Sequence, residues 1–204
     1  MSNKTLVCLY TEGATDKVFY DRLLDYIKTK SANGKFIVDQ IKKINIAGIG
    51  NFKKKLINKF KKEIDINKYK DYKKIVVLCY DNDVFEFNPN PPMNRQELEK
   101  ELINSGAEKV IHCVAKHSIE DIFLKDIDNI VKSLNLNKSI IKNLQGSGYE
   151  KMKYIYKKAN RVYVKGENVE NFVYSLNMEK ICNNQCETYC KLCMILLGQK
   201  GCKK

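Results

Sequence analysis

The sequence predicts an α/β protein with a mainly parallel sheet of four strands, flanked by helices and followed by a helical C-terminal extension. Short apolar runs alternate with longer segments whose apolar residues recur at helical spacing. Two of the apolar runs lead into acidic residues: Asp81 directly follows residues 74–80, and Glu12 follows residues 6–10 after one threonine. Because alternating strands and helices favour parallel units, we expect both acidic ends at one edge of the sheet.

The predicted elements follow this alternation along the chain. The strand at 6–10 stops at Thr11-Glu12-Gly13, and a helix follows it, with Thr15 as a favoured N-cap residue and Asp16 in the first turn. Further strands are expected at 36–47, 74–80 and 109–114, and an edge strand at 161–165. Helices are expected at 51–64, 94–105, 149–159, 167–176 and 178–197, with short pieces at 128–134 and 138–144, and a proline-rich loop at 84–93.

Acidic residues mark the ends of the predicted strands. Glu12 ends the first strand, and Asp81-Asn82-Asp83 ends another. Carboxylates held within a few ångströms of one another repel strongly unless a cation lies among them. Mg²⁺ prefers carboxylate oxygens as ligands. The sequence therefore predicts a divalent cation site at this edge.

This pair of strand ends resembles the Toprim domain of topoisomerases, bacterial primases and several nucleases, over roughly residues 4–126. The family pairs a strand ending in Glu-Gly with a later strand ending in Asp-x-Asp, which stand here as Glu12-Gly13 and Asp81-Asn82-Asp83. The segment TEGATDKVFY, with Asp16 four residues after Glu12, is most similar to the OLD-type and stand-alone nuclease branch. The resemblance implies a Rossmann-like fold.

The resemblance also implies roles for particular residues. One or two Mg²⁺ or Mn²⁺ ions would be held by carboxylates, with Glu12 as ligand or general acid/base. The metal ligands implied are Glu12, Asp16, Asp81, Asp83 and Glu120. Glu120 lies in Ser-Ile-Glu-Asp, which is similar to a third acidic motif of this branch, although acids in a first helical turn also complement the helix dipole. Lys165, before a glycine, is the candidate for the family's lysine near the scissile phosphate.

The charge of the chain indicates a polyanionic partner. Lys and Arg number 37 against 24 Asp and Glu, which gives a formal net charge of +13, and nucleic acid is the partner that such a balance favours. The candidate nucleic-acid-binding residues are Lys53, Lys54, Lys55, Lys59, His117, Lys151 and Lys153. The alternatives are a solvated helix face for the lysines, a structural role for His117, and the lysine-rich composition of an AT-rich coding sequence.

Four cysteines near the end of the chain could form a zinc site. Cys182, Cys186, Cys190 and Cys193 are separated by four, four and three residues, which places them on one face of a helix. Four thiolates along a continuous helix span about 16 Å at 1.5 Å per residue, too far for one tetrahedral ion. We therefore favour a stripe of buried cysteines that pack on the core over Zn²⁺, an iron–sulfur centre or a redox sensor.

The domain prediction is a catalytic core over 1–126 and a mostly helical extension over 127–204 that packs on it. No apolar run is long enough to span a membrane, no signal peptide is evident, and the cysteines do not form a disulfide pattern, so we expect a cytoplasmic protein. The predicted function is a Mg²⁺-dependent nuclease of DNA or RNA, in phage defence or a mobile element. The alternatives are a non-enzymatic nucleic-acid-binding subunit with a partner ATPase, or an rRNA-maturing endoribonuclease; a homodimer is a further expectation.

Overall fold

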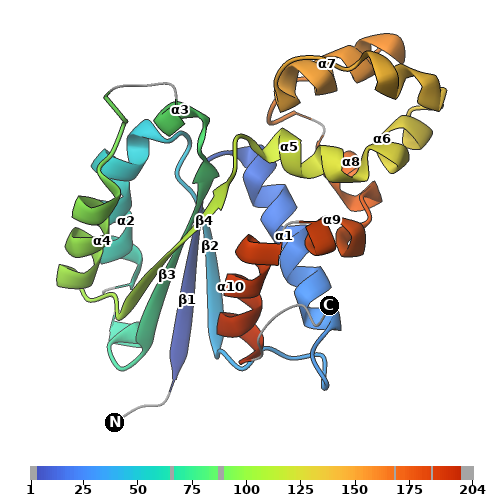
Figure 1. Cartoon of the computed structure of the whole chain (residues 1–204). Coiled ribbons are helices and arrows are strands. Elements are labelled where there is room, and N and C mark those ends of the chain that lie inside the picture. The colour runs from blue at the N-terminus through green and yellow to red at the C-terminus, as the bar shows by residue number, and fades with distance from the viewer. Residues whose placement is uncertain (1–3, 65–66, 87–89, 168, 185, 199–204) are drawn as a thin grey trace.

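The computed structural model describes residues 4–64, 67–86, 90–167, 169–184 and 186–198 (Figure 1). Within these ranges it leaves the side chains of residues 54, 63, 67, 84 and 186–188 undescribed. The architecture is therefore that of the described part of the chain.

The centre of the molecule is a sheet of four parallel strands in the order β2-β1-β3-β4. The strands are β1 (Thr5–Thr11), β2 (Gln40–Asn45), β3 (Lys73–Asp81) and β4 (Lys109–Ala115). The two central strands, β1 and β3, are buried along most of their length, as continuous apolar runs in a parallel sheet require. The predicted α/β class and parallel four-stranded sheet are confirmed.

Helices cover both faces of the sheet (Figure 1). On one face lie α2 (Ile57–Ile64) and α4 (Arg95–Asn104), together with a π-helical turn, η1 (Phe52–Leu56). Their apolar side chains form one core layer against β1 and β3; its helical members are Phe52, Leu56, Phe60, Ile64, Leu98 and Leu102. Asn94 caps α4, because its side chain accepts the backbone N–H groups of Gln96 and Glu97.

The opposite face is covered by α1 (Ala14–Thr29) and α10 (Cys186–Leu197), and the other C-terminal helices extend from α1 past the carboxyl edge of the sheet (Figure 1). Those other helices are α5 (Ile119–Phe123), α6 (Ile127–Ser133), α7 (Gly148–Lys158), α8 (Val169–Ser175) and α9 (Met178–Asn184). Buried side chains of the sheet, α1 and these helices belong to one continuous apolar cluster. Residues beyond 126 thus share a core with the sheet.

Several elements differ from the sequence prediction. The helix expected at 51–64 begins with the π-helical turn, and the proline-rich loop opens with a short helix, α3 (Asp83–Glu86), with residues 87–89 outside the described part. The helix expected at 178–197 is two helices, α9 and α10, on either side of residue 185, which is not described. The remaining short elements are 3₁₀ turns: η2 (Asn67–Tyr69), η3 (Leu124–Asp126) and η4 (Lys138–Asn143).

The expected edge strand at 161–165 is wrong. Residues 161–164 form neither helix nor strand and do not join the described sheet, whose edges are β2 and β4. The alternating pattern Val162-Tyr163-Val164 is that of a strand, yet Val162 is 81% exposed while Tyr163 is buried. Tyr163 is buried because its side chain, like that of Lys165 two residues later, reaches the carboxyl edge of the sheet.

Candidate active site at the carboxyl edge of the sheet

The first two acids are brought together by the pairing of β1 with β3. Thr11 lies opposite Cys79 in the parallel register, so Glu12 follows the end of one strand while Asp81 ends its neighbour. The backbone N–H of Glu12 donates to the carbonyl of Cys79 at 3.0 Å, and the backbone N–H of Asp81 donates to Glu12 Oε2 at 3.2 Å. Adjacent parallel strands therefore place the two carboxylates side by side, as the sequence predicted.

Asp16 joins them from the first turn of α1. Its side chain is only 2% exposed. The helix begins at Ala14 with Gly13 as its N-cap, in place of the predicted N-cap Thr15. A Cβ at Gly13 would lie 3.2 Å from Asp16 Oδ2. A glycine at this position thus leaves room for the carboxylate to lie close to the strand end.

Glu120 reaches the same place from α5, which follows β4. Ser118 caps this helix in a reciprocal arrangement with Asp121, whose Oδ2 accepts the Ser118 hydroxyl at 2.9 Å and its N–H at 3.2 Å. The dipole-complementing interpretation therefore applies to Asp121. Glu120, fully buried, faces the other acids. We call Glu12, Asp16, Asp81 and Glu120 the carboxylate cluster.

Lys165 supplies a cation to the carboxylate cluster. Its Nζ lies 2.8 Å from Asp81 Oδ2 and 3.8 Å from Glu120 Oε2. The next residue, Gly166, holds the segment in place, because its N–H donates to Thr15 Oγ1 at 2.7 Å. Gly166 has a φ of 91°, which side-chain-bearing residues rarely adopt. The lysine thus comes from a segment about 150 residues away from α1, anchored by one backbone hydrogen bond.

Burial makes the charges of the carboxylate cluster costly. Desolvation raises the pKa of Asp81 to about 7, despite the lowering effect of Lys165. Burial, followed by the charge of Asp81, raises the pKa of Asp16 well above its usual value. The pKa of Glu12 is raised by burial, against the hydrogen bond from the Asp81 backbone. One lysine does not fully compensate these acids.

Lys165 itself is held as a cation. Burial alone would lower the pKa of its ammonium group, but the charges of Asp81 and Glu120 outweigh that effect and raise the pKa. Lys165 is therefore a hydrogen-bond donor and a positive charge at neutral pH, and is not poised as a general base.

Asp83 and His117 lie at the rim of the carboxylate cluster. Asp83, half-buried at the start of α3, lies near enough to Glu12 for its charge to raise the pKa of that carboxyl. The backbone N–H groups of Asn82 and Asp83 donate to the carbonyl of His117 at 3.0 and 3.1 Å, which ties the β3 and β4 ends together. The His117 ring contacts Glu86 Oε2 at 2.8 Å, so its imidazole lies outside the carboxylate cluster.

The chemistry of the carboxylate cluster fits a hard divalent cation, although the described side chains do not form a complete coordination group. No set of three His, Cys, Asp or Glu side chains in the described ranges stands in metal-binding geometry. Yet Asp81 Oδ1 and Glu120 Oε2 are buried and receive no hydrogen bond from any described residue, and buried oxygens of this kind normally have a partner. Lys165 Nζ lies close to both residues. Oxygen-only donors around a buried excess of negative charge suit Mg²⁺ or Mn²⁺.

The lysines predicted to bind nucleic acid lie in two separate regions. Lys53 and Lys55 are exposed on η1, whereas Lys59 donates to the backbone carbonyl of Asn45 at 3.0 Å and so has a structural contact. The side chain of Lys54 lies outside the described residues. Lys151 and Lys153 lie on α7, where Lys153 stacks over the Tyr149 ring.

The cysteines near the C-terminus are on two helices. Cys182 is buried in α9, and Cys190 and Cys193 are half-buried in α10. The side chain of Cys186 lies outside the described residues. Zinc binding by these cysteines therefore stays a prediction, and the burial of Cys182 agrees with the packing interpretation.

Two residues of the site were missed by the sequence analysis. The Tyr163 hydroxyl donates to Glu120 Oε1 at 3.1 Å, and Thr15 accepts the Gly166 N–H through its hydroxyl oxygen. A signal for Tyr163 was present: the strand expected at 161–165 would place Tyr163 and Lys165 on the same side, because they are two residues apart. In the structure both side chains reach Glu120. No local pattern could have paired Thr15 with Gly166, because 151 residues separate them.

No family model, curated protein or solved structure matches the chain. No helix in the described ranges combines the length and the apolar character that crossing a membrane would need.

Proposed function

We propose that the chain is a metal-dependent phosphodiesterase that hydrolyses DNA or RNA, with the carboxylate cluster as its active site. The observation that carries the proposal is the convergence of three buried acids, Asp16, Asp81 and Glu120, with the half-buried Glu12, from two strand ends and two helix starts. Lys165 lies among them. Buried acids with raised pKa values are costly, and such groups gather at functional sites. The formal charge of +13 supports a nucleic-acid substrate.

The position of each acid in the carboxylate cluster indicates its role. Asp81 and Glu120 each offer an oxygen with no hydrogen-bond donor in the structure, and with Asp16 they would hold Mg²⁺ or Mn²⁺. Such an ion, when bound, polarises a phosphoryl oxygen and lowers the pKa of a coordinated water. Asp83, at the rim, is a further ligand candidate.

Glu12 is the candidate for proton transfer. It is less buried than Asp16 and Asp81, and its raised pKa brings it closer to neutral, where a general base is most effective. The Asp81 N–H orients its carboxylate through Oε2. Lys165, a stable cation, would donate to a non-bridging oxygen of the scissile phosphate and stabilise the charge that develops there.

A second function rests on a different interpretation of the same contacts. The Lys165 pairs with Asp81 and Glu120 make an ion-pair network that could be purely structural. The chain would then be a non-enzymatic nucleic-acid-binding subunit, for example of a partner ATPase. This alternative predicts binding without cleavage.

Cleavage of three substrates by purified protein separates the two functions. Plasmid DNA, single-stranded DNA and structured RNA are incubated with Mg²⁺, with Mn²⁺ and with EDTA, beside a Glu12→Gln variant. The Gln side chain keeps an oxygen acceptor for the Asp81 N–H but removes the charge. Metal-dependent products that disappear in the variant support the nuclease and identify its substrate. Salt-sensitive binding without products under every condition supports the binding subunit.

A further inference from the structure

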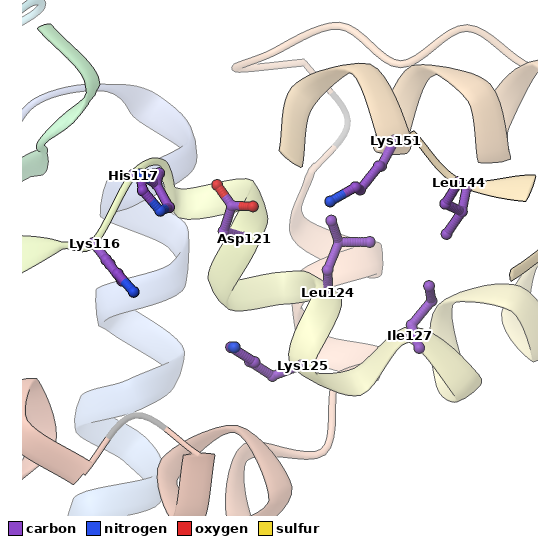
Figure 2. A pocket seen from close by; sticks show the side chains of 8 residues that line it. All are labelled: Lys116, His117, Asp121, Leu124, Lys125, Ile127, Leu144 and Lys151. Atoms are coloured by element: carbon purple, nitrogen blue, oxygen red, sulfur yellow. The ribbon is translucent and has the colours of Figure 1, made fainter. Parts of the chain in front are cut away.

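A basic pocket lies beside α5, on a different side of this helix from the carboxylate cluster. It has a volume of about 450 Å³, within the range of roughly 300–1,000 Å³ typical of small-ligand sites. The lining side chains come from the loop after β4, from α5, η3 and α6, from the residue after η4, and from α7. Figure 2 shows them: Lys116, His117, Asp121, Leu124, Lys125, Ile127, Leu144 and Lys151.

The lining of this basic pocket has two chemical parts. The ammonium groups of Lys116 and Lys125 point toward the same open space between them (Figure 2). Lys151 extends from α7 toward Asp121 and Leu124 (Figure 2). The aliphatic side chains of Leu124, Ile127 and Leu144 gather on the α6 and η4 side (Figure 2). Three cations beside an apolar wall suit a ligand that carries both negative charge and a flat or apolar body.

The positive charge of the pocket is largely uncompensated. Among the described residues, none of the three lysines forms a salt bridge. Lys116 lies near enough to Glu86 only to contribute to the lowered pKa of that carboxyl, after its hydrogen bonds with His117 and Asn82. Asp121, the one acid in the lining, already accepts two hydrogen bonds from Ser118.

The pocket is built by a close contact between two helices. A Cβ at Gly148 would lie 2.8 Å from the backbone nitrogen of Asp121, so the start of α7 packs directly on α5. Glu120 and Asp121 are consecutive on α5 and point to different sides of the helix, one into the carboxylate cluster and the other into the pocket. Because consecutive residues of an α-helix differ in direction by about 100°, the two sites lie on adjacent sides of α5, within about one helix diameter of each other, ~10 Å. That distance corresponds to a few nucleotides of a strand.

We infer that this basic pocket binds a nucleoside phosphate, with the phosphate on the lysines and the base or sugar against Leu124, Ile127 and Leu144. The inference rests on the proposed function for its source: a nucleotide of the substrate strand that flanks the cleaved bond. A free mononucleotide carries the same chemistry and is the second source. Base–aliphatic contact and lysine–phosphate contact together explain why the lining has both parts.

Binding measured without cleavage tests this inference. The protein carries Glu12→Gln in EDTA, and fluorescence anisotropy follows labelled oligonucleotides of DNA and RNA, long enough to span both sites, across a range of salt concentrations. The pocket variant combines Lys116→Ala, Lys125→Ala and Lys151→Ala. The control variant combines Lys28→Ala, Lys35→Ala and Lys100→Ala, three exposed lysines away from the pocket lining, so both variants lose the same charge.

The pocket variant should bind at least about 10-fold more weakly, and the control variant less than about 3-fold more weakly. The salt dependence should also flatten in the pocket variant, by about 0.7 in slope for each phosphate of a single strand that the lysines no longer neutralise. Equal losses of affinity in both variants would overturn the inference. A single Lys151→Glu change is the second variant, and thermal melting of each variant confirms that it is folded.

Competition identifies the chemistry and its source. AMP or dAMP should displace the oligonucleotide at lower concentration than inorganic phosphate does, because only the nucleotide reaches the apolar wall. Displacement at equal concentrations, or equally good displacement by an acidic peptide, would overturn the nucleoside part. Displacement by AMP below about 1 mM indicates a free nucleotide as the ligand. Displacement by AMP only above about 1 mM, still at lower concentration than phosphate, indicates a nucleotide within a strand. Cleavage is assayed separately. If the pocket binds nucleotides but the protein does not cleave, the nuclease proposal is wrong and the pocket inference stands.

Discussion

The acids of the carboxylate cluster and the cysteines of α9 and α10 are both residue types that bind metals, but the fold arranges them differently. The acids of the carboxylate cluster are dispersed over more than 100 residues of sequence and converge in space. The cysteines of α9 and α10 are close in sequence but lie along two helices, with Cys182 buried and Cys190 and Cys193 half-buried. Proximity in sequence along a helix spreads side chains at 1.5 Å per residue, whereas parallel strand ends collect them at one edge.

The two groups also differ in electrostatic cost. Burial raises the pKa values of Glu12, Asp16 and Asp81 in the carboxylate cluster. When these acids are ionised, the cluster therefore lowers the stability of the folded chain, unless a metal ion adds to the charge of Lys165. A buried cysteine packs as a small apolar side chain and costs nothing of that kind. A costly arrangement is the stronger indication of function. Substitutions in the two groups should therefore differ in their effects.

The largest effect is expected on catalysis. Glu12→Gln should lower the rate of phosphodiester cleavage by about 10²–10⁴-fold, the usual contribution of a general acid–base residue. The double change Cys190→Ser and Cys193→Ser should leave the rate within about 3-fold, because these thiols lie outside the carboxylate cluster. Both are measured by single-turnover cleavage in Mg²⁺. Equal losses in the two variants would contradict the contrast.

The next effect concerns the cation in the carboxylate cluster. Lys165→Met should lower the free energy of unfolding of the metal-free protein by about 1–3 kcal/mol, less than for a fully buried pair, because the lysine side chain is 41% exposed. Mg²⁺ should restore more stability to the variant than it adds to the unmodified chain, because the ion replaces the missing charge. Urea unfolding with Mg²⁺ and with EDTA measures both.

A matched control for this lysine is Lys43→Met. Lys43 pairs with Asp21 at the surface, away from the carboxylate cluster, and has a similar exposure of 41%. Its replacement should cost less than about 1 kcal/mol, with no added response to Mg²⁺. A response to Mg²⁺ that is the same in both variants would show that the ion does not bind at the carboxylate cluster.

A smaller effect is expected from pH. The pKa of Asp81 is raised from 3.8 to about 7 in the folded chain, so between these values the folded state binds more protons than the unfolded state. Stability therefore falls as pH rises through this window. From pH 6 to pH 8, Asp81 should cost the metal-free protein about 1 kcal/mol. Thermal melting in EDTA measures the trend, and Asp81→Asn should reduce it; an unchanged trend would contradict the assignment.

The smallest effect is expected at the cysteines. Cys182→Ala should destabilise the chain by about 1 kcal/mol through poorer packing in α9, and Cys190→Ser and Cys193→Ser by less, because they are half-buried. Zn²⁺ or a chelator should not change the melting temperature of any of these variants relative to the parent. If a chelator instead lowered the melting temperature of the parent protein but not that of the cysteine variants, a metal site at these cysteines would be established.

Much of the fold followed from patterns in the sequence. Continuous apolar runs predicted the buried strands β1 and β3. Helical spacing predicted α4 and α7 to within two residues at either end, and the start of α1 to within one residue. The helix boundaries were less secure. The π-helical turn at Phe52–Leu56 and the separation of α9 from α10 left no mark in the apolar periodicity, because both keep the same face buried.

The candidate site divides in the same manner. Glu12, Asp81 and Asp83 could be predicted together because each follows the end of an apolar strand, and strand ends share an edge in a parallel sheet. Lys165 was predicted only from the family resemblance, and its contacts with Asp81 and Glu120 depend on a segment that was taken for a strand. The choice between Glu120 and Asp121 depended on which of the two capped the helix.

By itself, the sequence determined the parallel sheet and the edge at which its acids collect, because these follow from local periodicity and from where each strand stops. Only the tertiary structure decided how the acids are compensated and what lies beside them. Lys165 reaches Asp81 because Gly166 is hydrogen-bonded to Thr15 across the chain. The basic pocket exists because α7 packs on α5. Contacts between residues so far apart in the sequence depend on how whole helices pack. Local sequence patterns do not predict that packing.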